Sequence, residues 1–189
     1  MVYRVYSEKK KGLNNEAEAL LHELKNFLGV SSVTGVRLLN RYDVENIDKD
    51  LFEYCKTAVF SEPQQDNVYE EVSLDGDYVV GVEYLPGQFD QRADSAAQCI
   101  QLISQSDRPM VRTAKIYLFR GDFSAGEKEK IEKYLINPVE SRKASLKKPE
   151  TLAVEYALPE TVETVAGFLD LDRPGLEKLI AARGFAMDL

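Results

Sequence analysis

The chain has 189 residues, of which 44% are hydrophobic and 30% are charged, a composition that predicts one globular domain and a remainder. Acidic residues outnumber lysine and arginine by 32 to 24, and the net charge of −8 argues against a partner rich in phosphate, such as a nucleic acid. No apolar run approaches a membrane span or a signal peptide, and Cys55 and Cys99 lack the spacing of a disulfide framework or metal site, so we expect a cytoplasmic protein with two buried thiols.

The first half of the chain alternates between strand and helix patterns. Residues 2–7 and 36–40 have the alternating or apolar character of strands. Residues 15–28 and 48–60 have the apolar spacing of amphipathic helices, and Gly29 is the residue type that commonly ends a helix.

The second half repeats this order. Residues 78–84 and 111–120 are predicted strands, and residues 91–103 form the predicted helix between them. A last helix begins after Ser124, which has the capping-box spacing to Glu127. Strand, helix, strand and helix therefore follow one another twice.

Local similarities support an internal duplication. Residues 41–44 and 120–123 both begin with arginine and have aspartate third; they stand 79 positions apart and are expected to open corresponding helices. Similar polar extensions follow Phe60 and Leu135, which are 75 positions apart. We therefore predict an α+β fold, a duplicated ferredoxin-like pseudo-dimer with antiparallel or mixed sheets and helices on one face. The predicted domain covers residues 1–148, with repeats at about 1–72 and 77–148.

Residues 149–189 differ in character. Two short helices are predicted over 159–169 and 173–183, the second with Pro174 in its first turn. We interpret this segment as the start of a helical linker domain that is truncated.

Residues 86–98 are the densest polar stretch of the chain. A Pro-Gly turn leads from a strand into a helix whose free N–H groups suit an anion. The same residues also suit a scaffold, in which Asp90 caps the helix and Arg92 pairs with Asp94 or another neighbour. Both interpretations stay open.

Residues 137–142 also allow two interpretations. Glu140 and Arg142 could contact a partner, or the segment could be a polar loop in which asparagine satisfies backbone groups. The single histidine, His22, is interpreted as structural, and the chain contains no nucleotide-binding glycine motif, nucleophile elbow or Cys–His pair. No catalytic set follows from the residues alone.

A family resemblance adds to these predictions. The sequence VEYLPGQFDQRADSAAQCIQL at 82–102 closely resembles the amino-terminal region of the large, single-chain phosphoribosylformylglycinamidine synthases. Four further blocks support it, at 38–47 (LLNRYDVENI), 60–71 (FSEPQQDNVYEE), 134–142 (YLINPVESR) and 183–189 (RGFAMDL). The resemblance implies a PurS-like domain, similar to a dimer of the small PurS-type subunit, in a ligase that uses ATP and glutamine-derived ammonia to convert an amide to an amidine in purine biosynthesis.

For this chain the resemblance implies a role in assembly. It would hold the synthetase and glutaminase domains of the same polypeptide so that ammonia passes between them, and by itself it would be inactive. No catalytic, cofactor or metal residue is assigned to it, since ATP and Mg²⁺ belong to the full-length enzyme and neither cysteine matches the glutaminase nucleophile. The predicted inter-domain contacts are Gln88, Asp90, Gln91, Arg92, Asp94, Ser95, Gln98, Asn137, Glu140 and Arg142.

Two other classes of function remain. A ferredoxin-like regulatory domain that binds a small molecule is the main alternative, although the chain lacks a glycine-rich ligand loop. A nucleic-acid module is disfavoured by the negative charge and by the missing aromatic motif of RNA-binding sheets. We expect no nucleic-acid or membrane partner.

Overall fold

One six-stranded sheet, with every neighbouring pair of strands antiparallel, organises the fold. The computed structural model describes residues 1–153 and 164–185, and the chain divides into two units, Met1–Ala153 and Val154–Leu189. The first unit is α+β and contains strands β1 (Tyr3–Lys9), β2 (Val33–Glu45), β3 (Asp66–Tyr69), β4 (Tyr78–Tyr84), β5 (Met110–Gly121) and β6 (Ser141–Lys143). Its helices are α1 (Asn15–Asn26), α2 (Lys49–Ala58), α3 (Gln91–Ser104) and α4 (Ala125–Leu135). The described part of the second unit contains a short 3-10 helix (Phe168–Asp170) and α5 (Arg173–Arg183).

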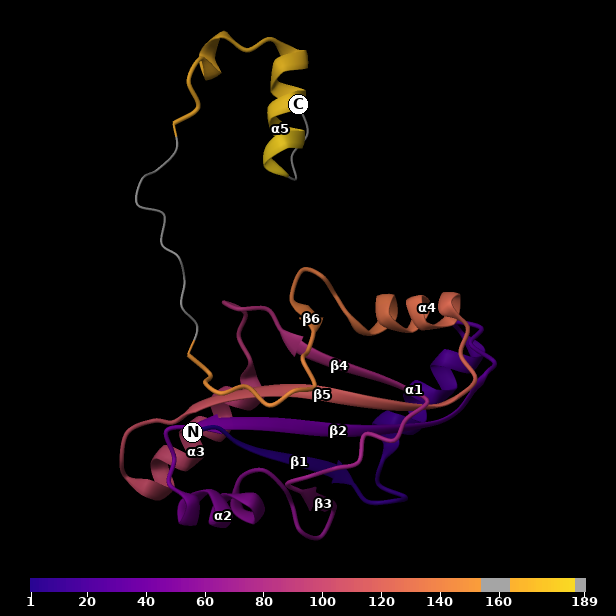
Figure 1. The fold of residues 1–189 in the computed structure, drawn as a ribbon, viewed down its shortest axis with the longest axis vertical. Helices are drawn as coiled ribbons and strands as arrows, with labels where there is room; N and C mark the ends of the chain where they lie inside the picture. The colour runs from indigo at the N-terminus through magenta and orange to yellow at the C-terminus, as the bar shows by residue number, and fades with distance from the viewer. Residues whose placement is uncertain (154–163, 186–189) are drawn as a thin grey trace. The chain divides into compact units, whose positions relative to one another are not determined.

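The strand order is β3-β1-β2-β5-β4-β6 (Figure 1). The long strands β2 and β5 form the centre, with Leu39 opposite Ile116 near the middle of their pairing. β1 and β3 extend the sheet on the β2 side, whereas β4 and β6 extend it on the β5 side. Residues 3–69 and residues 78–143 thus each supply three strands, on opposite sides of the β2–β5 junction.

Helices α1 to α4 pack on one face of the sheet, which we call the helix face. Two separate apolar clusters lie beneath them. Leu24 of α1 and Ile131 of α4 contribute to the first, and Phe52 of α2 and Ile100 of α3 contribute to the second. Strand residues of the same face complete both clusters, so the helices are fixed by apolar burial rather than by local propensity alone.

The opposite face is covered by extended chain. Residues 144–152, which we call the strap, run along it, and Ala144 packs with Leu39 and Ile116 in a third apolar cluster. At the start of the strap, the Ala144 N–H donates a hydrogen bond to the Gly81 carbonyl of β4, at 2.8 Å. The buried side chain of Leu152 lies at its far end.

Buried charges hold the strap against the sheet. Arg4 donates two hydrogen bonds to the Asp43 carboxylate, at 2.5 and 2.8 Å, and Arg41 Nε lies 3.2 Å from the same group. Burial alone would lower the pKa of Arg4, but its hydrogen bonds to Asp43 and the charge of that carboxylate raise it overall. Arg41, with weaker pairing, has a pKa lowered mainly by burial.

The same arginines satisfy the backbone of the strap. Arg41 donates to the Ser145 carbonyl at 2.6 Å and Arg4 to the Leu146 carbonyl at 2.9 Å. These carbonyls have no partner in a neighbouring strand, and the charged side chains of the sheet donate to them in place of strand backbone.

Most predicted elements are confirmed, with changes at their ends. β4 and α5 have the predicted bounds, and Ser124 forms the capping box with Glu127 at the start of α4. β2 extends beyond its predicted end at Asn40 because Arg41, Asp43 and Glu45 are buried in ion pairs or in contacts with the strap. They alternate along the strand with the buried residues Tyr42 and Val44. The prediction that residues 41–44 open a helix is therefore wrong, since they belong to this strand.

Other predictions need correction. Cys55 is buried as expected, but Cys99 is exposed, because the buried residues of α3 are Ala93, Ala96, Ala97 and Ile100 and Cys99 lies beside them on the helix. His22 is exposed on α1. Of the helix predicted over 159–169, residues 159–163 lie outside the described part, and a left-handed Gly167 followed by a short 3-10 helix replaces its remainder.

Candidate binding cavity on the helix face

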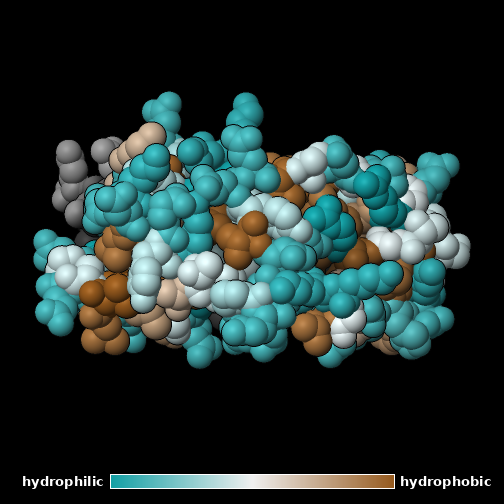
Figure 2. All heavy atoms as spheres, turned by 90° about the horizontal axis from the view of Figure 1, so that it is seen from below, coloured by the Kyte–Doolittle hydropathy of each residue, from teal (hydrophilic) through white to brown (hydrophobic). Residues whose placement is uncertain are grey.

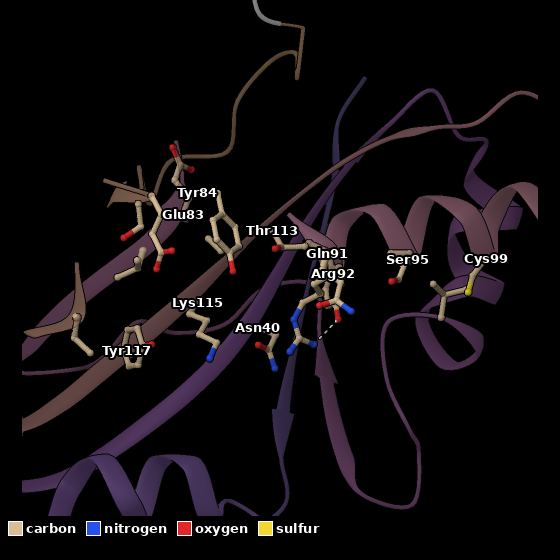
Figure 3. A pocket seen from close by; sticks show the side chains of 18 residues that line it. Asn40, Glu83, Tyr84, Gln91, Arg92, Ser95, Cys99, Thr113, Lys115 and Tyr117 are labelled. Carbon is tan, nitrogen blue, oxygen red and sulfur yellow. Dashed lines mark hydrogen bonds between the residues drawn. The ribbon is translucent and has the colours of Figure 1, made fainter. Parts of the chain in front are cut away.

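A cavity of about 650 Å³ lies on the helix face beside α3 (Figure 3). Strands β2 and β5 form its floor, α3 forms one wall, and β4 with the turn before β6 forms another. Its volume lies within the range of roughly 300–1,000 Å³ that is typical of small-molecule sites. It is therefore the strongest candidate site in the described residues of the first unit.

The floor is polar although it belongs to the centre of the sheet. Asn40 lies directly opposite Lys115, and Tyr42 lies directly opposite Thr113, in the β2–β5 register. These two pairs occupy the region between the two apolar clusters of the helix face, where no helix covers the strands completely. Asn40 Oδ1 is buried and accepts no hydrogen bond from the described protein groups.

The wall formed by α3 begins at Asp90. Its carboxylate accepts from the Ala93 N–H at 2.9 Å, which caps the helix, and from the Thr113 hydroxyl at 2.7 Å and N–H at 3.2 Å. Asp90 therefore fixes the start of α3 to β5. Within the first turn of the helix, Arg92 Nη1 donates to the Tyr42 hydroxyl at 3.2 Å.

Two cations face the cavity. Arg92 and Lys115 extend toward Asn40 in the close-up view (Figure 3). Burial alone would lower the pKa of Arg92, but its hydrogen bond to Tyr42 and nearby negative groups raise it overall, so it stays charged. Lys115 forms an ion pair with Glu16, in which both side chains are substantially exposed to solvent.

The remaining ionisable groups of the lining are neutral, paired or peripheral. Burial raises the pKa of Tyr117 to about 12, so this side chain stays protonated at neutral pH. Glu83 accepts from Arg142 at 2.8 Å and lies 3.6 Å from Arg41. Glu140 lies on the exposed turn at the rim, and Lys115 is the one charged residue among the β2 and β5 residues that line the cavity.

The two predicted polar segments meet at the rim of the cavity. Gln88 donates to the Val139 carbonyl at 3.3 Å, and the Leu85 N–H donates to the Glu140 carbonyl at 2.9 Å. Phe89 and Val139 are exposed, at 70% and 75%, which is unusual for apolar side chains of their size. Residues more than 40 positions apart thus form one mixed polar and apolar edge.

The structure places the predicted contact residues in three groups. Gln91, Arg92, Ser95 and Glu140 line the cavity, and Gln88 lies at its rim. The others bond within the fold: Asp90 as described above, Asp94 with Arg108, Gln98 with Asp94, Asn137 with its own turn, and Arg142 with Glu83. Asp90 thus caps α3, as the scaffold interpretation predicted, and Arg92 bonds to its neighbour Tyr42 whereas Asp94 pairs with Arg108.

Sequence reasoning missed the floor of the cavity. Asn40, Tyr42, Thr113 and Lys115 lie in or beside the predicted strands, but none was singled out. The available signal was a set of polar side chains at positions whose strand neighbours on the same face are apolar.

The lining contains Cys99 but no histidine, and within residues 1–153 and 164–185 no cluster of three or more acidic, cysteine or histidine side chains could hold a metal ion. The arrangement is thus suited to binding through charge and hydrogen bonds. Among the described helices, none is both long and apolar enough to cross a membrane. No model of a known protein family matches the chain, and no curated protein matches it either.

Proposed function

We propose that this chain is the PurS-like portion of a phosphoribosylformylglycinamidine synthase. In that role it scaffolds the synthetase and glutaminase domains of a cytoplasmic, ATP-dependent ligase and supports transfer of ammonia between them. The proposal rests on the resemblance of five sequence blocks described above. It includes an internal duplication of two ferredoxin-like halves.

The observation that carries the structural part is the spacing of the elements. The starts of corresponding strands and helices are 75 to 77 residues apart, for the pairs Tyr3 and Tyr78, Asn15 and Gln91, Val33 and Met110, Lys49 and Ala125, and Asp66 and Ser141. The two sets of three strands also occupy equivalent places on either side of the β2–β5 junction. Both features support a pseudo-dimer joined through its central strands.

The rim of the cavity supports a docking role. It combines the exposed side chains of Tyr84, Phe89 and Val139 with polar neighbours such as Gln88 and Gln91. Elsewhere, the face of the molecule in Figure 2 carries its hydrophobic side chains in small separate patches among hydrophilic ones. A mixed edge of this kind is typical of contacts between domains of one chain.

The proposal is tested by complementation. The 189-residue chain is mixed with a phosphoribosylformylglycinamidine synthase that lacks the corresponding region, and amidine formation is measured with glutamine and separately with ammonia. We expect the chain to restore the glutamine-driven reaction and to have no activity alone. Phe89→Ala together with Val139→Ala should reduce that restoration about tenfold, because both side chains are exposed at the rim and contribute little to folding.

The matched control is Phe27→Ala, which removes an equally exposed aromatic side chain next to α1, outside the cavity lining. It should restore activity as the unchanged chain does. A folded chain that never restores the glutamine-driven reaction, while the ammonia-driven reaction proceeds, would rule out the assembly role.

A further inference from the structure

The cavity on the helix face has chemistry that the assembly role does not use. Its floor holds a buried amide oxygen on Asn40, which lacks a protein partner, and the cation Lys115, and its α3 wall adds the cation Arg92. Sheet centres beneath helices are ordinarily apolar, because an unpaired polar group there costs free energy. A polar floor in this place is therefore suited to a hydrogen-bonding occupant.

Arg92 and Lys115 favour an anion as that occupant, because Glu83, the acidic residue on the β4 wall, already pairs with Arg142 and Glu140 lies on the exposed rim. The described residues engage Arg92 through one hydrogen bond, to Tyr42, and its guanidinium carries five N–H groups in a planar fork. Such a fork binds a carboxylate or phosphate through two parallel hydrogen bonds. Lys115 is held by an exposed ion pair with Glu16, and exposed pairs are weak, so an incoming anion can replace that carboxylate.

Asn40 adds a second requirement. Its Oδ1 accepts hydrogen bonds only, so an occupant that carries an N–H or O–H group close to its anionic group would supply the hydrogen bond that Asn40 lacks. Because Asn40 and Lys115 are opposite each other in the sheet, the anion and the donor would belong to one small molecule. Gln91 and Ser95, on the wall above, offer further hydrogen bonds to it.

We propose that this cavity binds a small organic anion, a carboxylate or phosphate monoester that also carries a hydroxyl or amino group. Arg92 and Lys115 bind the anionic group, and Asn40 accepts from the donor. This inference is independent of the assembly role, since it concerns the chain without its partner domains.

The chain carries its own reporter of occupancy. Cys99 lines the cavity and is exposed, whereas Cys55 is buried in the second apolar cluster, where burial raises the pKa of its thiol. A thiol reagent should therefore modify Cys99 first, since reaction requires access and the thiolate. A bound molecule should slow that reaction.

The experiment uses two matched pairs of probes with the full 189-residue chain. L-malate is compared with succinate, which lacks the hydroxyl, and ribose 5-phosphate is compared with inorganic phosphate. Binding is followed by calorimetry and by the rate of Cys99 modification. We expect one hydroxylated probe to bind at least about fivefold more tightly than its partner and to slow modification of Cys99, because a buried acceptor discriminates against a ligand that leaves it unpaired. Preference for malate would identify a carboxylate site, and preference for ribose 5-phosphate a phosphate site.

Three variants assign the contacts. Arg92→Gln should lower the affinity for the preferred probe about tenfold. The control is Arg120→Gln, which lies on the same strand as Lys115 but outside the lining and should leave that affinity unchanged. Asn40→Leu should remove the preference for the hydroxylated probe while preserving the fold, because it removes a buried polar atom that lacks a partner. Circular dichroism of each variant verifies folding.

Two results would overturn the proposal. One is that none of the four probes binds or protects Cys99 when it is present at millimolar concentration and in 20-fold excess over the chain. The other is equal binding within both pairs, which would mean that Asn40 is satisfied by water and that the cavity attracts anions without selecting them. Neither result would affect the complementation test, which does not depend on a small molecule.

Discussion

The two faces of the sheet are covered by different kinds of chain, and their residues differ accordingly. On the helix face, the cover consists of helices that pair their own backbone groups, and the residues beneath them are mostly apolar. On the opposite face, the strap is extended, and the sheet beneath it contains Arg4, Arg41, Asp43, Glu45 and Arg112. The difference teaches that the backbone of the covering segment decides which side chains a sheet must present.

The end of the strap at Leu152 shows this relation. Arg112 donates to the Leu152 carbonyl at 2.6 Å, and Glu45 accepts from the Leu152 N–H at 2.7 Å. Leu152 thus has its backbone satisfied by side chains of the sheet while its own side chain is buried. The hydrogen bond from Leu152 is the largest cause of the lowered pKa of Glu45.

The largest expected effect is on the buried ion pair of the strap face. Asp43→Ala would leave Arg4 and Arg41 buried without their shared carboxylate, and we expect it to lower the free energy of unfolding by about 3–5 kcal/mol in urea denaturation. The control is Asp94→Ala, which breaks a partly exposed pair with Arg108 and should cost no more than about 1 kcal/mol.

A triple variant, Arg4→Met, Arg41→Met and Asp43→Leu, sharpens the comparison. Apolar replacement of a buried ion cluster often restores stability, but here it also removes the donors to the carbonyls of Ser145 and Leu146. We therefore expect it to remain unstable in the same measurement. Full recovery of stability would contradict the view that these arginines serve the strap.

A smaller effect is expected where the strap approaches the sheet most closely. A Cβ atom on Gly81 would lie 3.1 Å from Ala144 Cβ and 3.2 Å from the Ala144 carbonyl oxygen and from Ile116 Cδ1. Gly81→Ala should therefore cost about 1–3 kcal/mol through overpacking, measured by urea denaturation. Gly35→Ala is the matched control, since its Cβ would meet only Arg120 carbon atoms at ordinary contact distances, and a similar loss there would refute this explanation.

The smallest effect concerns the start of α4 on the helix face. A helix pairs its own backbone groups except at its ends, so hydrogen-bonding partners are needed only there. Hydrogen bonds to Glu127 from the Ser124 hydroxyl and N–H, and then from Ser32, lower its pKa to about 2. Because this pKa is depressed on folding, the stabilisation is present above the ordinary value of about 4.3 and is lost as the pH falls toward 2.

Glu127→Gln should remove that pH dependence. The difference in urea midpoint between the unchanged chain and the variant should be constant above pH 5 and shrink between pH 4.3 and 2. A difference that stays constant through this range would show that the charge of Glu127 does not contribute to the cap.

Elements with a strong local signal were predictable. The apolar spacing of residues 15–28 and the capping box of Ser124 and Glu127 specify helices without reference to the rest of the chain. The short strands β3 and β6 were not predicted, because three or four residues carry little periodicity and pair only where a neighbouring edge is available. The length of β2 was underestimated because Arg41 and Asp43, which are polar in sequence, are buried through partners elsewhere in the chain.

By itself, the sequence determined the alternation of strands and helices, the acidic charge, and the polar character of residues 86–98, since each depends on residue type and spacing along the chain. Only the tertiary structure decided that Asn40, Arg92 and Lys115 face one cavity, and that Arg4 and Asp43 form a buried pair beneath the strap. The physical reason is that a buried polar group is stabilised by its partners, and these partners lie on strands, helices and loops distant in sequence.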